Sequence, residues 1–484
     1  MPLETVSRRD FLATSAVGAA LASAPAVAQT NANSRLRLGY IGVGGRAQTH
    51  IHSGCDLYNV DGSVEIATVC DVFNRYRDET AARVAAVTGK SPAKTGDYRD
   101  ILADKSIDAV VIATPDHWHA KQTIDALQAG KHVYCEKPMT HSVEEAIRVY
   151  KAWKESGLVM QVGVQSTSLP VWGAINERIN AGGFGKILQY QTEYFRNSDL
   201  GQWRYYKLAE DMTPKNIDWK MFLGADLGLA PQMPFDRAKF AQWRCYWDFG
   251  AGMFTDLFVH RTTSMLKATG LRFPGRVVGA GGIYLEYDGR GVPDVATVVA
   301  DFDEGVQGLV TATMCSGETP IKQVIRGHHA SAVLGVGEGF SGYDFVAERP
   351  QVTHDSSIVS ERVKVGGVEN SSLAHFKNFV DAAVAGRPEL VNCSPELGAA
   401  AMTVVKLGSR SYREGKVFHF DPDNLTYSDG SSAWADRWEK MSAEGAAPRH
   451  VPGWTAGDKG SVLFPSEYQK LAGPWVNGKD PADA

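Results

Sequence analysis

Short apolar runs alternate with stretches of helical periodicity in the first third of the chain. The runs are typical of strands and lie at residues 36–41, 64–70, 109–114, 132–135 and 159–164. Because nearly every position in them is apolar, we expect both faces of each strand to be buried, as in a parallel sheet covered by helices. Ser142 and Glu145 form a capping box that begins one of those helices. The pattern predicts a doubly wound α/β Rossmann domain over residues 35–165, with its ligand at the carboxyl ends of the strands.

The pattern changes from residue 187 onward, where apolar and polar positions begin to alternate. Two clear examples, residues 295–302 and 306–313, flank a short turn that contains a glycine. Alternation at every second position is typical of strands with one buried face, and such a turn joins two of them into a hairpin. Helical patterns return at residues 375–385 and 395–414. We therefore predict an α+β domain over residues 166–420.

The first 28 residues differ from the rest of the chain. Arg8 and Arg9 precede an alanine-rich apolar run at residues 13–24, and residues 26–28 form a small-x-small cleavage pattern. These features in this order predict a removable export signal. The paired arginines resemble a twin-arginine signal, whose pathway carries folded proteins, so we expect a periplasmic protein that acquires its cofactor before export. The apolar run is much shorter than the roughly 20 residues that cross a bilayer, so we expect no membrane span in the mature protein.

Composition and charge narrow the class of partner. The chain has 484 residues, of which 44% are hydrophobic and 22% charged, which is typical of a globular protein with two domains. A formal net charge of -5 provides no basic surface for a phosphate backbone, so we expect a small-molecule partner and no nucleic acid. The six cysteines contain no C-x-x-C pair, and Cys70 and Cys135 lie in apolar strands, which favours buried free thiols.

A glycine turn follows the first strand directly. Gly42 permits a tight turn, Gly44 lets the backbone approach a pyrophosphate, and Ala47 in the third small position lets a helix pack on the strand. The helix N-terminus then offers free N–H groups and partial positive charge to the phosphates. The strand, turn and helix together predict a nicotinamide dinucleotide site.

Asp71 ends the second strand at the spacing expected for the acid that binds the ribose hydroxyls. A carboxylate there repels a 2′-phosphate and favours NAD, whereas Arg75 and Arg77 nearby leave NADP open. We expect further cofactor contacts from the rest of the turn, from the other strand ends and from a residue that begins a helix beside the nicotinamide. These are Gly45, Arg46, Thr114, Pro115, His119, Glu136, Lys137 and Gln165.

Four separated stretches resemble the Gfo/Idh/MocA family, named after glucose-fructose oxidoreductase, inositol dehydrogenase and a rhizopine catabolism protein. They are residues 42–47, 113–119, 129–138 and 256–260, and a weaker match follows at residues 411–416. The resemblance implies a Rossmann domain followed by an α+β domain with a large, open, mostly antiparallel sheet, with a sugar or cyclitol bound between them. An open sheet also favours a homo-oligomer.

Oxidation of a hydroxyl by hydride transfer requires a base for the proton and a positive group beside the oxygen. Lys137 follows a strand at the cofactor-facing edge, and Asp256 and His260 lie four residues apart on a predicted helix, so they share one face. The resemblance implies that Lys137 polarises the substrate, that His260 is the general base and that Asp256 binds substrate beside it. Thr263 stands where relatives often carry an acid.

Other residues leave alternatives open. Trp243 and Arg244 belong to an aromatic cluster that predicts either a platform for a sugar or ordinary core or dimer packing. No set of three metal ligands has a recognisable spacing, so we expect no metal. The extension at residues 421–484 predicts either an arm packed on a neighbouring subunit or a loosely ordered tail.

The leading hypothesis is an exported oxidoreductase with a tightly bound cofactor that acts on a hydroxyl of a sugar, glycoside or cyclitol. A second hypothesis is a glycoside-cleaving enzyme, which oxidises its substrate transiently, eliminates the glycosidic group and returns the hydride. A third is a sugar sensor without catalysis. Because a sensor does not need the lysine and histidine that this chain has, the third hypothesis is the weakest.

Overall fold

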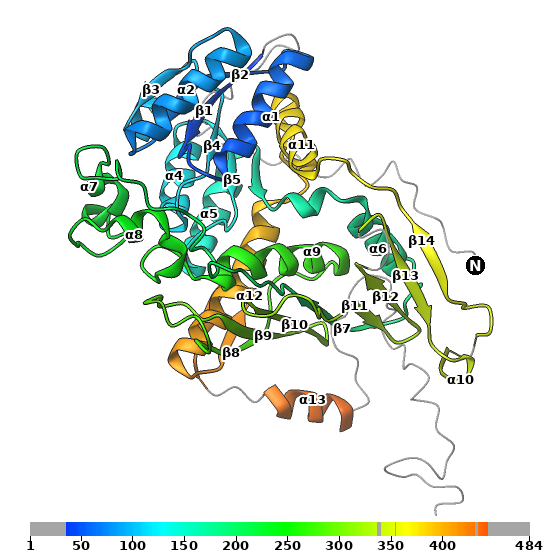
Figure 1. The fold of residues 1–484 in the computed structure, drawn as a ribbon. Coiled ribbons are helices and arrows are strands. Elements are labelled where there is room, and N and C mark those ends of the chain that lie inside the picture. Colours follow the sequence, from blue (N-terminus) through cyan, green and yellow to red (C-terminus); the bar gives the residue numbers. More distant parts are fainter. Residues whose placement is uncertain (1–34, 336–339, 354, 431–433, 444–484) are drawn as a thin grey trace, which may run out of the picture.

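A six-stranded parallel sheet forms the first part of the protein (Figure 1). The computed structural model describes residues 35–335, 340–353, 355–430 and 434–443. The strands are ordered β3-β2-β1-β4-β5-β6, which confirms the doubly wound Rossmann fold. The elements in chain order are β1 (Leu36–Ile41), α1 (Ala47–Val60), β2 (Val64–Cys70), α2 (Asn74–Thr88), β3 (Ala93–Thr95), α3 (Tyr98–Ala103), β4 (Ala109–Ile112), α4 (Asp116–Gln128), β5 (His132–Glu136), α5 (Val143–Ser156) and β6 (Met160–Gly163).

Local sequence explains most of these boundaries. Every residue of β4 and β5 is buried, as their continuous apolar character predicts. The Ser142 side chain accepts a hydrogen bond from the Glu145 amide, and the Glu145 carboxylate accepts one from the Ser142 amide, so the predicted capping box begins α5. Strand β3 was not predicted because it has three residues, lies at the sheet edge and contains no apolar run.

A ten-stranded sheet forms most of the rest and confirms the large, mostly antiparallel sheet. Its order is β14-β13-β12-β11-β7-β10-β9-β8-β15-β16, and the pairing of β7 with β10 is parallel. The strands are β7 (Ile187–Glu193), β8 (Arg276–Gly282), β9 (Val295–Phe302), β10 (Val306–Thr313), β11 (Gln323–Gly327), β12 (Ala330–Leu334), β13 (Gly342–Ala347), β14 (Glu361–Lys364), β15 (Phe418–Asp421) and β16 (Thr426–Ser428). Helices α6 (Pro170–Asn180) and α10 (Pro350–Thr353) belong to this part as well.

Three helices connect the two sheets. Helices α9 (Val259–Thr269) and α12 (Pro395–Glu414) pack on the ten-stranded sheet, and α12 also packs on α5 of the Rossmann domain (Figure 1). Helix α11 (Ser371–Ala385) returns to α1, where Phe376 and Phe379 contact the ring of Tyr134. The two parts of the chain therefore share buried apolar packing and hold the edges of both sheets in a fixed relation.

A long segment with little regular structure lies between β7 and α9. This cover segment, residues 199–249, contains the short helices α7 (Trp219–Leu223) and α8 (Arg237–Ala241). It pairs with the chain after β2, because Phe73 and Ile217 form a β-bridge and the Asp218 amide donates to the Val72 carbonyl at 2.9 Å. Phe222 and Phe240 complete an aromatic cluster around Phe73. The cover segment is thus anchored over the carboxyl ends of the Rossmann strands.

The chain termini lie partly outside the described residues. The export signal expected at residues 1–28 lies wholly outside them, and of the extension at 421–484 they include residues 421–430 and helix α13 (Trp434–Ala443). Trp434 packs against Arg276 of β8, and Arg437 pairs with Asp303, so this portion of the extension contacts its own chain. All six cysteines are free, as predicted, and Cys315 alone among them is partly exposed. Within the described part of the chain, no helix has the length and apolar character needed to cross a bilayer.

The contact between β8 and α12 gives a test of the fold. A Cβ atom added at Gly279 would lie 2.0 Å from the Gly408 carbonyl oxygen, so the strand and the helix meet backbone to backbone. We expect Gly279→Ala to force them apart and to lower the free energy of unfolding by about 1–3 kcal/mol in urea titrations. Ala280→Ser, at the exposed neighbouring position, is the control. Equal stability of both variants and the wild type would contradict this packing.

Candidate active site

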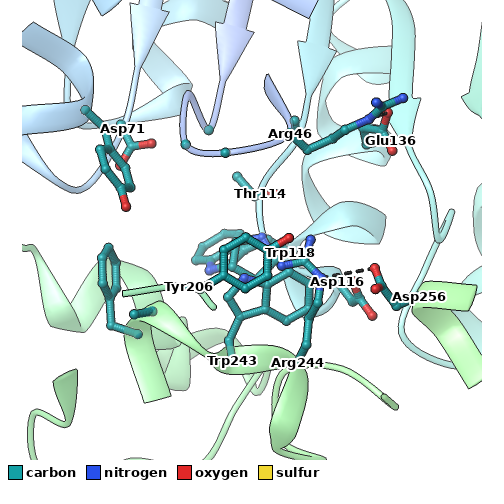
Figure 2. Close-up of a pocket in the computed structure, with 18 of the residues that line it drawn as sticks. Arg46, Asp71, Thr114, Asp116, Trp118, Glu136, Tyr206, Trp243, Arg244 and Asp256 are labelled. Carbon is teal, nitrogen blue, oxygen red and sulfur yellow. Dashed lines mark hydrogen bonds and ion pairs between the residues drawn. The ribbon is translucent and has the colours of Figure 1, made fainter. Parts of the chain in front are cut away.

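One cavity of about 620 Å³ lies between the glycine turn, the cover segment and the start of α9 (Figure 2). Its walls come from the ends of the Rossmann strands on one side and from the cover segment on the other. Fourteen of the fifteen residues expected to bind cofactor or substrate line it. These are Gly42, Gly44, Gly45, Arg46, Asp71, Thr114, Pro115, Glu136, Lys137, Gln165, Trp243, Arg244, Asp256 and His260. The fold therefore brings the separated motifs to one place.

The glycine turn has the shape that a dinucleotide needs. Gly42 has a φ of +79°, and a Cβ there would lie 2.8 Å from the Thr114 amide, so no side chain fits. A Cβ at Gly45 would meet nothing closer than 3.8 Å, which leaves the cavity side of the turn open. No side chain caps the N-terminus of α1, and although the Gln48 and Thr49 amides donate to the Gly45 and Arg46 carbonyls, the helix end still directs partial positive charge toward a pyrophosphate. These residues fit the predicted cofactor.

Asp71 lies at the adenosine end of this turn. Its carboxylate accepts hydrogen bonds from the Val43 and Phe73 amides, both at 2.8 Å, which fixes its orientation beside the turn. Burial raises the pKa of Asp71 to about 6. Arg75 pairs with Asp211 of the cover segment at 2.7 Å, and neither it nor Arg77 is among the described residues that line the cavity. This arrangement provides an acceptor for ribose hydroxyls, and the Arg77 guanidinium lies beside it, behind Gly96.

Glu136 connects the turn to the end of β5. Its buried carboxylate accepts from Arg46 Nε at 2.8 Å, from His50 Nε2 at 2.7 Å and from the Lys137 amide at 2.8 Å. Burial acts to raise the pKa of Glu136, but the Arg46 guanidinium and His50 outweigh it and hold that pKa well below its ordinary value. Arg46 also reaches Gln165 at 3.3 Å. Glu136 thus remains ionised and fixes both Arg46 and the backbone of Lys137.

Asp256 is the carboxylate to which Lys137 is bound. Its Oδ1 accepts from Lys137 Nζ at 2.7 Å and from Arg244 Nε at 3.0 Å, and its Oδ2 accepts from Trp203 Nε1 at 2.8 Å. Lys137 Nζ also donates to the Asp256 carbonyl at 3.0 Å. Burial acts to raise the pKa of Asp256, but Lys137 and Arg244 outweigh it and hold it far below its ordinary value. We expected Asp256 to bind substrate directly, whereas here it orients two cations that face the cavity.

His260 faces the same cavity from α9. Asp256 lies in a π-helical turn, Phe254–Phe258, which precedes α9, so the predicted helix is wider at this point than a regular α-helix. Burial lowers the pKa of His260 well below its ordinary value, and the charge of Lys137 lowers it further. Neither ring nitrogen has a hydrogen-bond partner among the described residues. His260 thus has a neutral ring with no acid hydrogen-bonded to it among the described residues, and Thr263 donates to the Val259 carbonyl.

His119 has a different position from the one expected. It does not line the cavity, and its ring nitrogens lie 2.6 Å from the Pro138 carbonyl oxygen and 2.7 Å from that of Thr114. Because a carbonyl oxygen only accepts, this geometry favours a ring with a proton on each nitrogen. Burial acts to lower the pKa of His119, but Cys135 and the carbonyl groups outweigh it and raise it. We predicted that His119 contacts the cofactor. In the structure it instead connects the loop after β4 with the loop after β5.

Sequence patterns did not identify several residues of the cavity. Tyr206 lines the cavity from the cover segment, where no periodic pattern marks it. Trp203 of the same segment is fully buried and is connected to the cavity through its hydrogen bond to Asp256. The Arg244 guanidinium lies 4.2 Å from the ring centroid of Trp243 and 5.1 Å from that of Tyr206, so the aromatic cluster lines the cavity and flanks a cation (Figure 2). Asp116 also reaches the cavity, although the sequence showed it only as part of a motif. No group of three metal-ligating side chains occurs within the described ranges.

Comparison with known proteins identifies the first domain. Residues 36–164 match the Gfo/Idh/MocA model, an oxidoreductase family with an NAD-binding Rossmann fold. This Rossmann domain belongs to the Gfo/Idh/MocA oxidoreductases. Of the solved structures similar to the whole chain, a levoglucosan dehydrogenase in complex with NADH and levoglucosan is 19% identical, with a TM-score of 0.58 over 82% of this chain and all of that one. The WlbA dehydrogenase of Bordetella pertussis, in complex with NADH and UDP-GlcNAcA, is 20% identical, with a TM-score of 0.57 over 80% of this chain and 98% of that one.

Curated relatives match less than half of this chain. A glycosyl hydrolase family 109 protein of Shewanella sp. (strain W3-18-1) is 29% identical over 42% of this chain and 51% of its own length. An alpha-N-acetylgalactosaminidase of Shewanella oneidensis is 28% identical over the same shares. A levoglucosan dehydrogenase of Pseudarthrobacter phenanthrenivorans is 32% identical over 36% of this chain and 45% of its own. The match thus spans about half the length of these relatives.

The protonation of Asp71 gives a test of its role. Its carboxyl is neutral below about pH 6 and ionised above it, and ribose hydroxyls donate to the ionised form. We therefore expect the affinity of the apoprotein for NAD to fall by up to about tenfold as the pH is lowered by one to two units through that value. Isothermal calorimetry measures this affinity, and Asp71→Asn should remove the pH dependence. A wild-type affinity independent of pH would contradict the assigned contact.

Proposed function

We propose that this protein is an NAD-dependent oxidoreductase that acts on a hydroxyl group of a sugar, glycoside or cyclitol. The observation that carries the proposal is the placement of Lys137 and neutral His260 on the wall of the same cavity as the glycine turn. This pair supplies the positive group and the base that hydride transfer from a carbinol requires.

Lys137 and His260 have different roles in the proposed reaction. The ammonium group of Lys137 has three N–H donors, and Asp256 accepts from it through a carboxylate oxygen and a carbonyl oxygen. The remaining donor is available for the substrate oxygen and stabilises negative charge that develops on it. His260 takes the hydroxyl proton, because burial keeps its ring neutral at the start of the reaction. The nicotinamide of the bound cofactor supplies the hydride acceptor.

The substrate class rests on the other walls of the cavity. Arg244 offers donors beside the Trp243 ring, a pairing that suits a ring bearing hydroxyl groups. The named substrates of similar proteins, levoglucosan and UDP-GlcNAcA, are also carbohydrates. These features favour a sugar or a glycoside, and a cyclitol presents the same groups.

A glycoside-cleaving activity is the second candidate. The glycosyl hydrolase family 109 protein and the alpha-N-acetylgalactosaminidase among the relatives favour it. Such an enzyme oxidises a hydroxyl, eliminates the glycosidic group and returns the hydride, so it needs the same cavity and one more acid–base group. A sensor without catalysis is disfavoured because Lys137 and His260 are both present and both face the cavity.

We further propose export by the twin-arginine pathway to the periplasm with a resident cofactor. The paired arginines Arg8 and Arg9 support the export, and the cover segment, anchored at Phe73 and Arg75, supports slow release of the dinucleotide. We also propose a homo-oligomer, because Leu188 and Val346 of the ten-stranded sheet are exposed apolar residues.

The roles of Lys137 and His260 can be tested separately from cofactor binding. We expect Lys137→Ala and His260→Ala each to slow the reduction of bound NAD by at least about 100-fold. The measurement is nicotinamide absorbance of the purified holoprotein with a panel of sugars and methyl glycosides, and mass spectrometry should find the dinucleotide retained in both variants. Arg362→Ala, on the edge strand β14, is the control. Reduction at the wild-type rate in either variant would contradict the proposal.

A further inference from the structure

Besides Asp71 and Asp256, the cavity is lined by Asp116, whose surroundings differ in charge from those of Asp256. Asp116 is the first residue of α4, directly after the strand end that carries Thr114 and Pro115. Its side chain lies beside Arg244 and Asp256 and lines the cavity, although the residue is only 2% exposed (Figure 2). None of the functions proposed above uses it.

The immediate contacts of Asp116 leave its carboxyl group free to react. The Thr255 hydroxyl accepts from the Ala251 amide at 3.0 Å, and its own proton is directed to Asp116. No ion pair to Asp116 occurs within the described part of the chain, and the Arg244 Nε is bound to Asp256. Gly250 leaves open the space next to the carboxyl, since a Cβ there would lie 3.2 Å from Asp116 Oδ2.

With these neighbours, the Asp116 carboxyl is about half ionised at neutral pH. Burial raises the pKa of Asp116 to about 7, and the charge of Asp256 adds to that effect. Arg244 and Thr255 offset it only in part. The same cavity thus contains Asp256, which is ionised at neutral pH, and Asp116, which exchanges a proton near neutral pH. Two carboxyl groups with such different pKa values are typical of acid–base pairs in enzymes.

A buried lysine that does not line the cavity, Lys406, interacts electrostatically with Asp116. Lys406 lies on α12, and burial lowers its pKa to about 8, whereas the charge of Asp116 acts to raise it. Glu145 of α5 interacts with the same ammonium group. The charged and titratable groups that act on Asp116 are therefore Arg244 of the cover segment, Lys137 after β5, Asp256 before α9 and Lys406 on α12.

We propose that Asp116 is a second acid–base residue of this cavity, which transfers protons at the substrate carbon adjacent to the oxidised one. The proposal rests on the function proposed above. Hydride transfer and loss of the hydroxyl proton convert the carbinol into a ketone, and the ketone acidifies the neighbouring C–H. The Asp116 carboxylate takes that proton, the C–H electron pair moves into the C–C bond, and an enolate forms. Return of the carbon-bound proton from Asp116, of the hydride to the carbonyl carbon and of the hydroxyl proton from His260 restores the starting sugar.

The reaction requires two proton transfers, one from the hydroxyl group and one from the neighbouring C–H, and one base cannot accept both protons. His260 and Lys137 serve the hydroxyl group, so His260 already holds a proton when the ketone has formed. Asp116 arises from another element, the N-terminus of α4, and provides an independent base. If the carbon next to the enolate carries a glycosidic oxygen, the same electron pair expels that group, so Asp116 is also the additional residue that cleavage of a glycoside requires.

The test follows hydrogen exchange into the substrate. The holoprotein is incubated in deuterated water with methyl glycosides of common hexoses, and those that reduce bound NAD are recovered for NMR. We expect deuterium at the carbon next to the oxidised one. In Asp116→Asn, the ratio of this exchange to the rate of NAD reduction should fall by at least about 100-fold, and Asp116→Glu should restore part of it.

The pH profile distinguishes a proton-transfer role from a structural one. Exchange by the wild type should rise through about pH 7, because the carboxylate form is the base. Lys406→Met removes a positive charge that favours the carboxylate, so the midpoint should move to higher pH. An unchanged midpoint in that variant would count against the proposal.

Three further outcomes would overturn it. The first is an Asp116→Asn variant in which the ratio of deuterium exchange to NAD reduction is unchanged. This includes a variant in which exchange and reduction fall by the same factor. The second is a wild-type protein that reduces its NAD with a glycoside and incorporates no deuterium. The third is the failure of every glycoside to reduce bound NAD, which refutes the proposed function itself and is thereby distinguished from the first two.

Discussion

The buried carboxylate of Asp256 is the interaction on which the geometry of the cavity depends. It accepts from Lys137 at the end of β5 and from Arg244 and Trp203 of the cover segment, while its own backbone begins the turn into α9. Removing one partner from such a buried pair costs about 3–5 kcal/mol, because the other charge remains without compensation. Asp256 therefore holds three parts of the chain in one arrangement.

Glu136, the last residue of β5, and Lys137, which follows it, connect this arrangement with the cofactor turn. Glu136 is an anion fixed to Arg46 of the glycine turn, and Lys137 is a cation fixed to Asp256. Two adjacent residues with opposite partners thus connect the dinucleotide turn with the substrate side of the cavity. A shift of either partner would change the distance between the cofactor and Lys137, and rates of hydride transfer depend steeply on such distances.

Local patterns predicted the elements that depend on local causes. The apolar runs, the capping box at Ser142 and the turn at Gly42 all act over a few residues, and each is present where the sequence placed it. The cover segment was not predicted, because its structure comes from distant contacts, such as the bridge between Phe73 and Ile217, which no periodicity records.

The same distinction applies within the candidate site. Motif spacing correctly placed Lys137 and His260 on one cavity, since helix geometry and strand order determine their positions. It misplaced His119, whose two ring nitrogens are hydrogen-bonded to carbonyl groups. It also gave no role to Asp116. The environment of a buried side chain depends on what packs against it from elsewhere in the chain, and the neighbours of Asp116 come from the cover segment, the turn before α9 and α12.

The central claim is that Asp256 organises the cations of the site, and Asp256→Asn tests it most directly. The measurement is the rate at which a reactive sugar reduces bound NAD, compared with Asp344→Asn, which removes the partner of Arg362 in a partly exposed ion pair. We expect the first variant to retain the dinucleotide and to lose at least about 100-fold in rate, which corresponds to about 2.7 kcal/mol of transition-state stabilisation. Near wild-type reduction by Asp256→Asn would contradict the account.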